Sequence, residues 1–186
     1  MEPTHHQGNV RIRRTSPRKL TIFALSVAFA VILSYVEFLL PSLSYIAPGI
    51  KAGLANIVIV SLLYVGGIYD AAVVSLIRVL IISLLFGSPT GAVYSLCGAV
   101  ISLAVMFLLK TSRKFSVPFV SIAGGVFHNI AQITLFLIVS QTKEVAVYIP
   151  ILAAGGIISG LAVGIVSSLF LSYLKRSGLI KKYTCK

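Results

Sequence analysis

The stretch RIRRTSPRKLTIFALSVAFAVILSYVEFLL, residues 11–40, decides the class of the fold. Its first part, 11–19, is rich in Arg and Lys, and residues 20–40 form an apolar run whose one charged side chain is Glu37. A helix needs about 20 apolar residues to cross the hydrocarbon core of a bilayer. The run is too long for a signal peptide, and no small-residue cleavage site closes it. We therefore expect residues 20–40 to stay in the protein as a membrane-spanning helix.

Five further apolar runs follow, separated by Pro, Gly and Ser residues that are typical of turns. Hydrophobic residues make up 58% of the 186-residue chain and charged residues only 11%, which lies outside the range of soluble globular proteins. The sequence predicts an all-α, polytopic integral membrane protein with six transmembrane helices, of which the second is short for a crossing. We place these helices at residues 20–40, 53–67, 70–86, 91–109, 119–140 and 150–174.

The Lys and Arg residues predict the orientation of the chain, because most of the 16 lie in three clusters. Cytoplasmic loops of membrane proteins are enriched in Lys and Arg. With six crossings all three clusters fall on one side, so we expect both termini in the cytoplasm and the protein in the inner membrane. The net charge of +12 is then explained by topology and by anionic lipid headgroups, not by nucleic acid. The clusters occupy residues 11–19, 110–114 and 175–186, and the loops expected outside are 41–52, 87–90 and 141–149.

The chain is expected to form a single domain, because no linker is long enough to separate two. The six-helix transmembrane domain covers residues 18–176. A basic cytoplasmic tail at 1–17, which we expect to be disordered, precedes it, and a second basic cytoplasmic tail at 177–186 follows it.

Several kinds of active site are excluded by the residues that the chain lacks. It contains one aspartate, Asp70, and three glutamates, so it cannot build an Asp-rich box that holds Mg²⁺ and a diphosphate. It has no phosphate-binding loop of the Walker type, so it cannot hydrolyse ATP by itself. Its cysteines and histidines show no metal-ligand spacing. We therefore expect no catalytic residue, no metal and no cofactor.

Charged side chains at membrane depth are costly, which makes them candidates for function. Arg78 lies near the middle of the third predicted helix, too deep for its side chain to reach either interface comfortably. It needs an internal partner, and Glu37 is the carboxylate available in the membrane. Two interpretations remain open. Arg78 and Glu37 form a structural ion pair, or Arg78 is a ligand-binding base in a cavity where a substrate anion exchanges with Glu37.

A second polar group lies in the fifth predicted helix. His128 and Gln132 share one face of this helix, with Asn129 beside them, and Gly124-Gly125 precede them. A single buried His is more often hydrogen-bonded than functional, but three polar residues in an apolar helix indicate the lining of a polar cavity. We expect one outward-opening cavity that prefers an anionic or strongly hydrogen-bonding ligand. Its predicted substrate-binding residues are Glu37, Lys51, Asn56, Arg78, Tyr94, His128, Asn129 and Gln132.

Two rows of small residues predict close helix packing, because small residues spaced by four positions let helix backbones approach closely in lipid. Gly156, Gly160 and Gly164 show this spacing in the sixth predicted helix, and we expect them to pack inside the protein. Ala24 and Ala28 show it in the first helix. For this alanine pair, internal packing and docking to another membrane subunit both remain open.

Three segments, taken in order, resemble a known family. They are Gly49–Ile57 (GIKAGLANI), Phe86-Gly87 followed by Tyr94–Gly98 (YSLCG), and Gly124–Gln132 (GGVFHNIAQ). They resemble the Gx transporter family, which is also labelled heptaprenyl diphosphate synthase component I, and the resemblance covers roughly residues 18–176. That family is similar to the substrate-binding S components of energy-coupling factor (ECF) importers, which have six helices.

The resemblance implies an S component that takes up a small vitamin-like molecule while docked to an ECF transmembrane coupling subunit and two ATPase subunits. Flavin-related cargo is one option, because the family is associated with flavin-dependent membrane systems. In S components an alanine pair on the first helix contacts the coupling subunit, and Ala24 and Ala28 match that pair. The alternatives are a non-catalytic membrane subunit associated with heptaprenyl diphosphate synthesis, or a structural partner in a respiratory membrane complex with no ligand of its own.

Overall fold

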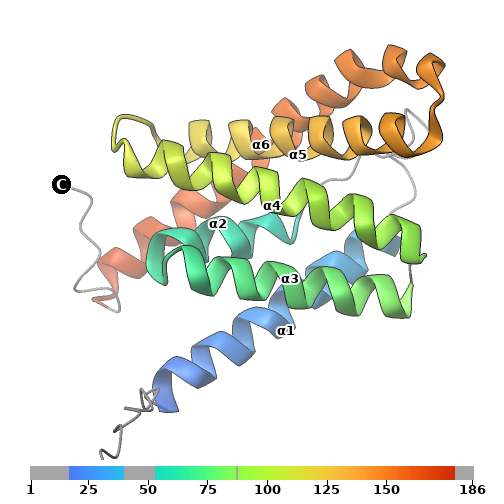
Figure 1. The fold of residues 1–186 in the computed structure, drawn as a ribbon. Helices are drawn as coiled ribbons and strands as arrows, with labels where there is room; N and C mark the ends of the chain where they lie inside the picture. Colours follow the sequence, from blue (N-terminus) through green and yellow to red (C-terminus); the bar gives the residue numbers. More distant parts are fainter. Residues whose placement is uncertain (1–16, 40–52, 87, 179–186) are drawn as a thin grey trace, which may run out of the picture.

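The computed structural model describes residues 17–39, 53–86 and 88–178, and within these ranges it contains helices and no strand. This confirms the prediction of an all-α protein. A 3-10 helix, η2, lies in the predicted 141–149 loop. The predicted loop 41–52 lies outside the described residues, as do most residues of the predicted tails at 1–17 and 177–186. The elements are α1 Pro17–Leu39, α2 Asn56–Val65, α3 Ile68–Leu85, α4 Pro89–Thr111, α5 Val117–Ser140, η2 Lys143–Tyr148 and α6 Ile149–Arg176 (Figure 1).

Five of the described helices are long and apolar enough to cross a membrane, and α2 is not. α2 has ten residues, which gives a length of about 15 Å against a hydrocarbon core of about 30 Å. Glycines with positive φ bound it, Gly53 (φ +73°) on one side and Gly67 (φ +101°) on the other, and this backbone conformation favours glycine. Five of the six predicted crossings thus correspond to helices that are long and apolar enough to span a membrane, and the short second crossing is not confirmed.

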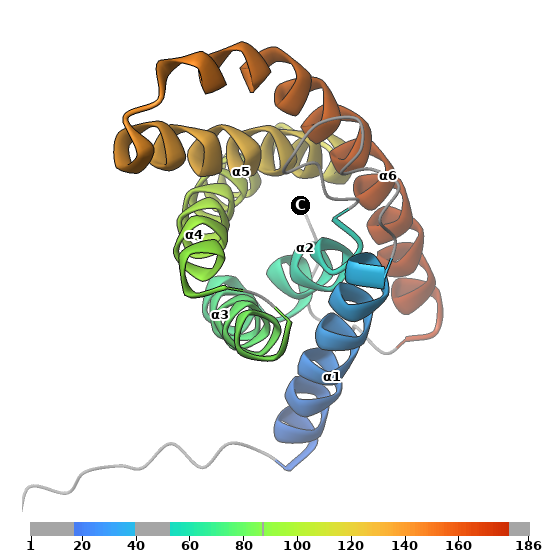
Figure 2. The ribbon, with the colours of Figure 1, turned by 90° about the vertical axis from the view of Figure 1, so that its right-hand side faces the viewer.

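The short helix α2 lies at the centre of the bundle. Figure 2 shows α3, α4, α5 and α6 following one another around a ring, with α2 inside it and α1 beside α2 and α3. Ile59, Val60 and Leu63 of α2 are buried in a core that also contains Val120 of α5 and Val163 of α6. Protein thus shields the middle of α2 from lipid, which suits a helix too short to span the bilayer alone.

α5 and α6 pack with their backbones in contact along a row of small residues. A Cβ atom added at Gly156 would lie 2.8 Å from the carbonyl oxygen of Gly125, and one added at Gly160 would lie 2.7 Å from the Cα atom of Ile122. Gly164 is equally close to the start of α5. Because real Cβ atoms do not approach other atoms so closely, these positions need glycine. This confirms the prediction that the glycine row packs inside the protein.

The described basic residues near the helix ends mark one end of the bundle. Lys19 at the start of α1 forms an ion pair of 3.5 Å with Asp70 at the start of α3. Lys110 near the end of α4 donates a hydrogen bond to the carbonyl of Leu63 near the end of α2. The α4–α5 connection and the end of α6 lie at the same end, on the left in Figure 1. This is the arrangement that the basic clusters predict, and its assignment to the cytoplasm stays a prediction.

Candidate functional site

The carboxylate of Glu37, in the last turn of α1, lies at the N-terminus of α2. Its Oε1 atom accepts a hydrogen bond of 2.5 Å from the backbone N–H of Gly53, whose carbonyl accepts one of 2.8 Å from the N–H of Asn56. A negative charge beside the first turn of a helix is stabilised by free N–H groups and by the helix dipole. The end of α1 therefore holds the start of α2 in place.

A positive charge occupies the complementary position at the other end of α2. Lys110 donates to the carbonyl of Leu63, and its Nζ atom lies 5.3 Å from the centroid of the Tyr64 ring. Cations are favourable both at a helix C-terminus and over an aromatic face. In the sequence, Lys110 indicates only the orientation of the chain in the membrane. No local pattern indicates this contact, because 47 residues separate Lys110 from Leu63.

Arg78 projects into the bundle from the middle of α3, on the same side as the buried residues Val74 and Ser75. Its Nε atom is buried and has no hydrogen-bond partner, although the side chain as a whole is partly exposed. Glu37 is the charged group that acts on Arg78 electrostatically. However, the Glu37 carboxylate is hydrogen-bonded to Gly53, and no direct ion pair joins these two described side chains. The Glu37 carboxylate is thus bound to a backbone amide and not paired with the guanidinium.

His128 and Gln132 of α5 pack against Gly98 of α4. A Cβ atom added at Gly98 would lie 3.0 Å from the His128 ring and 2.9 Å from Gln132 Cγ, so glycine makes room for both side chains. Along the same contact, Tyr94 meets Phe136 edge to face, with 5.7 Å between the ring centroids. The structure therefore brings Tyr94, His128 and Gln132 together where α4 meets α5.

Asn129 points away from this contact. Its Nδ2 atom donates a hydrogen bond of 2.8 Å to the carbonyl of Leu152 in α6, and the side chain is buried. Adjacent residues are about 100° apart around a helix axis, so Asn129 and His128 occupy different faces of α5. The Asn129 amide joins α5 to α6, and it does not lie at the α4–α5 contact that contains His128.

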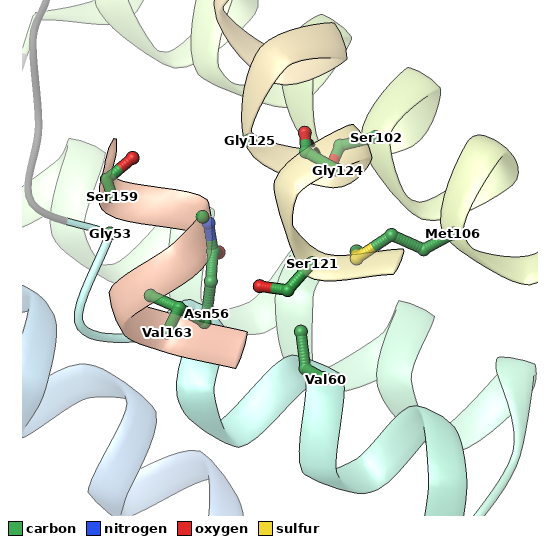
Figure 3. A pocket seen from close by; sticks show the side chains of 11 residues that line it. Gly53, Asn56, Val60, Ser102, Met106, Ser121, Gly124, Gly125, Ser159 and Val163 are labelled. Atoms are coloured by element: carbon green, nitrogen blue, oxygen red, sulfur yellow. Dashed lines mark hydrogen bonds between the residues drawn. The ribbon is translucent and has the colours of Figure 1, made fainter. Parts of the chain in front are cut away.

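A small cavity lined by both polar and apolar residues lies between α2, α4, α5 and α6 (Figure 3). Its volume is about 10 Å³, which is roughly the space that one water molecule needs. Asn56 is the predicted site residue in its lining, and Figure 3 shows Asn56 and Ser121 on opposite sides of it. A small-molecule site is typically larger by more than tenfold. This cavity therefore fits water and not a vitamin. Among the described residues, no group of three His, Cys, Asp or Glu side chains lies close enough together to hold a metal ion.

α1 packs less against the rest of the described protein than the other long helices do. Only 6% of the residues in the apolar stretch of α1 are buried, against 22% to 28% in the corresponding stretches of the other long helices. Ala24 and Ala28 are exposed on this helix. Of the predicted binding residues, Lys51 lies outside the described residues, so its place in the site stays a prediction.

These features define a multi-pass α-helical membrane protein with ionisable side chains inside its bundle. A family model described as heptaprenyl diphosphate synthase component I matches residues 26–170. The chain belongs to this family, which confirms the family predicted from the three sequence segments. The match includes Ala28 and every predicted substrate-binding residue, but not Ala24. Comparison with curated proteins and with solved structures found no match.

Proposed function

We propose that this chain is the substrate-binding membrane subunit, or S component, of an ECF-type importer in the cytoplasmic membrane. Its substrate is a small vitamin-like molecule that is anionic or flavin-related. In this proposal the chain carries out no catalysis itself, and a separate transmembrane coupling subunit and two ATPase subunits supply the energy. Both termini face the cytoplasm, where the basic end of the bundle meets anionic headgroups.

The observation that carries this proposal is the exposed face of α1. Ala30 and Ser34 are buried on one side of this helix, whereas Ala24 and Ala28 are exposed. Helices associate in lipid through close backbone contact at small residues. An exposed pair of alanines one helical turn apart, on the long helix with the least internal packing, therefore suits a second membrane subunit.

The polar interior of the bundle supports a ligand-binding role. Ionisable and amide side chains inside a membrane protein are costly and usually serve binding or transport, and Arg78, His128 and Gln132 are of this kind. The water-sized cavity beside Asn56 is too small for a vitamin. Under this proposal the substrate therefore does not occupy this cavity with the packing that the described residues show.

Replacement of Ala28 by Trp tests the proposal, with Ala104 as the matched control. Ala104 is also an exposed alanine in a long helix, but in α4. Ala28→Trp should abolish co-purification of the coupling and ATPase subunits, because a bulky side chain prevents close approach. It should leave retention of a bound small molecule, measured by native mass spectrometry, unchanged. Ala104→Trp should change neither result, and normal association of Ala28→Trp would refute docking through α1.

A second function is favoured by the description of the family itself. The chain would then be a non-catalytic membrane subunit associated with heptaprenyl diphosphate synthesis. With a single aspartate, Asp70, it would leave the Mg²⁺-dependent chemistry to a partner. Native mass spectrometry of the purified protein separates the two functions. A retained vitamin-like molecule supports the importer, and a retained prenyl diphosphate supports the synthase subunit.

A further inference from the structure

Arg78 keeps a hydrogen-bond donor that the described protein does not satisfy. The buried Nε atom has no partner, and buried polar groups without one are rare enough in proteins to call for an explanation. A guanidinium offers donors in a planar fork that matches the oxygens of a carboxylate or phosphate. Arg78 therefore has the chemistry of an oxyanion-binding side chain inside the bundle.

Gly53 supplies a second donor that already holds an oxyanion. Its backbone N–H binds the Oε1 atom of Glu37 at 2.5 Å, next to the N-terminus of α2. α2 is long enough for its dipole to favour negative charge at this end. Glu37 also acts electrostatically on Arg78. The carboxylate that the Gly53 amide binds is thus also the countercharge that acts on Arg78.

We propose that the Gly53 N–H and the Arg78 guanidinium, at the positive end of α2, bind the carboxylate or phosphate group of an anionic ligand in place of Glu37. The inference rests on the proposed function only in taking this ligand to be the transported substrate. Charge-assisted hydrogen bonds from Arg and from a backbone amide are the strong kind that such a group needs. Glu37 is then a resident competitor that keeps the site charge-balanced until the ligand arrives.

A resident competitor has a measurable consequence, because it lowers the apparent affinity by the fraction of molecules whose site is free. If Glu37 occupies the site in nine molecules of ten, its removal strengthens apparent binding about tenfold. Glu37→Gln removes the charge while keeping an oxygen that can accept from Gly53. Arg78→Gln removes the cation and should weaken binding by at least about tenfold. The two neutralising substitutions therefore shift affinity in opposite directions.

The experiment uses the full-length protein in nanodiscs of zwitterionic lipid. Sodium phosphate and sodium acetate are titrated at constant ionic strength, and the midpoint of thermal unfolding is recorded, because a ligand that binds the folded state raises it. The variants are Glu37→Gln, Arg78→Gln and the double variant Glu37→Gln/Arg78→Gln, which leaves no unpaired charge if the single Arg78 variant fails to fold. Lys114→Gln is the matched control, since Lys114 is an exposed cation in the α4–α5 connection.

We expect the midpoint of thermal unfolding to rise with anion concentration, and to reach a plateau, in the wild type and in Lys114→Gln. The rise should saturate at about tenfold lower anion concentration in Glu37→Gln and be lost in the folded double variant. A stronger response to phosphate or to acetate identifies the anionic group. An equal response in Glu37→Gln and the double variant, or none in any protein, would overturn the proposal.

Two further comparisons are made. One distinguishes a lipid headgroup from a free anion, and the other distinguishes failure of this inference from failure of the proposed function. Phosphatidylglycerol is added to the nanodiscs, and the Arg78-dependent rise of the unfolding midpoint with phosphate is measured again. If this rise is suppressed, a lipid headgroup occupies the same oxyanion site. If the anion response fails while the coupling subunits still co-purify, the inference fails and the importer stands. If the response is present but no coupling subunit associates, the oxyanion site stands without the importer.

Discussion

Gly160→Ala tests whether the α5–α6 contact depends on direct backbone approach. The added Cβ atom would lie 2.7 Å from the Cα atom of Ile122 and 2.8 Å from the carbonyl oxygen of Ser121. Non-bonded carbon atoms are most favourable at roughly 3.5–4.0 Å, so the helices would have to separate locally by up to about 1 Å. The opposing atoms belong to the backbone and cannot rotate away as the tip of a flexible side chain would.

The size of the effect follows from three contributions. Overpacking of a close contact costs about 1–3 kcal/mol. A separation that reaches the Asn129–Leu152 hydrogen bond, now 2.8 Å long, removes part of the roughly 0.5–1.5 kcal/mol that such a bond contributes. Alanine favours a helix over glycine by about 1 kcal/mol, which opposes both effects. We therefore expect Gly160→Ala to lower the free energy of unfolding by about 1–2 kcal/mol.

The measurement is reversible unfolding in mixed micelles with increasing SDS, followed by circular dichroism. Gly91→Ala is the matched control, because Gly91 is also helical and, among the described residues, a Cβ atom added there would meet only the hydroxyl of Ser88, at 3.1 Å. This control should be neutral or slightly stabilising. If Gly160→Ala were as stable as the wild type, the α5–α6 contact would not depend on the missing side chain.

Two further predictions concern the two ends of the bundle. Lys110→Met should lower the free energy of unfolding by about 1–2 kcal/mol, because it removes the charge and the hydrogen bond at the C-terminus of α2, whereas Lys114→Met should be neutral in the same SDS titration. For topology, a cysteine at Ser112 in a protein without its native cysteines should resist an impermeant thiol reagent in intact cells, and a cysteine at Thr142 should react. Labelling at Ser112 from outside would contradict the cytoplasmic placement of the basic end.

The long helices could be predicted because an apolar run of about 20 residues has few other structures available in lipid. The predicted helices at 91–109 and 119–140 lie within α4 and α5, and both helices begin slightly earlier. Proline in the first turn of each explains the difference, because proline is favoured at the start of a helix. Ser88 adds a cap by accepting a 3.1 Å hydrogen bond from Gly91 N–H.

The contacts of the candidate site were less accessible from the sequence. Membrane depth suggests that Arg78 and Glu37 should meet, but depth does not show that Glu37 binds the Gly53 amide, a backbone donor that residue types do not reveal. The divergence of Asn129 from His128 has a sequence signal, since adjacent helical residues cannot share a face. Its partner, a backbone carbonyl in another helix, has none.

The two ends of α2 are held by different helices, and this bears on how a partner could act on the ligand. Glu37 of α1 holds the Gly53 amide, and Lys110 of α4 holds the opposite end. Under the proposed function, a subunit that docks on Ala28 engages the same rigid helix that carries Glu37, nine residues or about 14 Å further along. Any tilt of α1 on docking would move the Glu37 carboxylate relative to α2 while Lys110 retained the other end. Docking and occupancy of the oxyanion site would then be coupled through one helix.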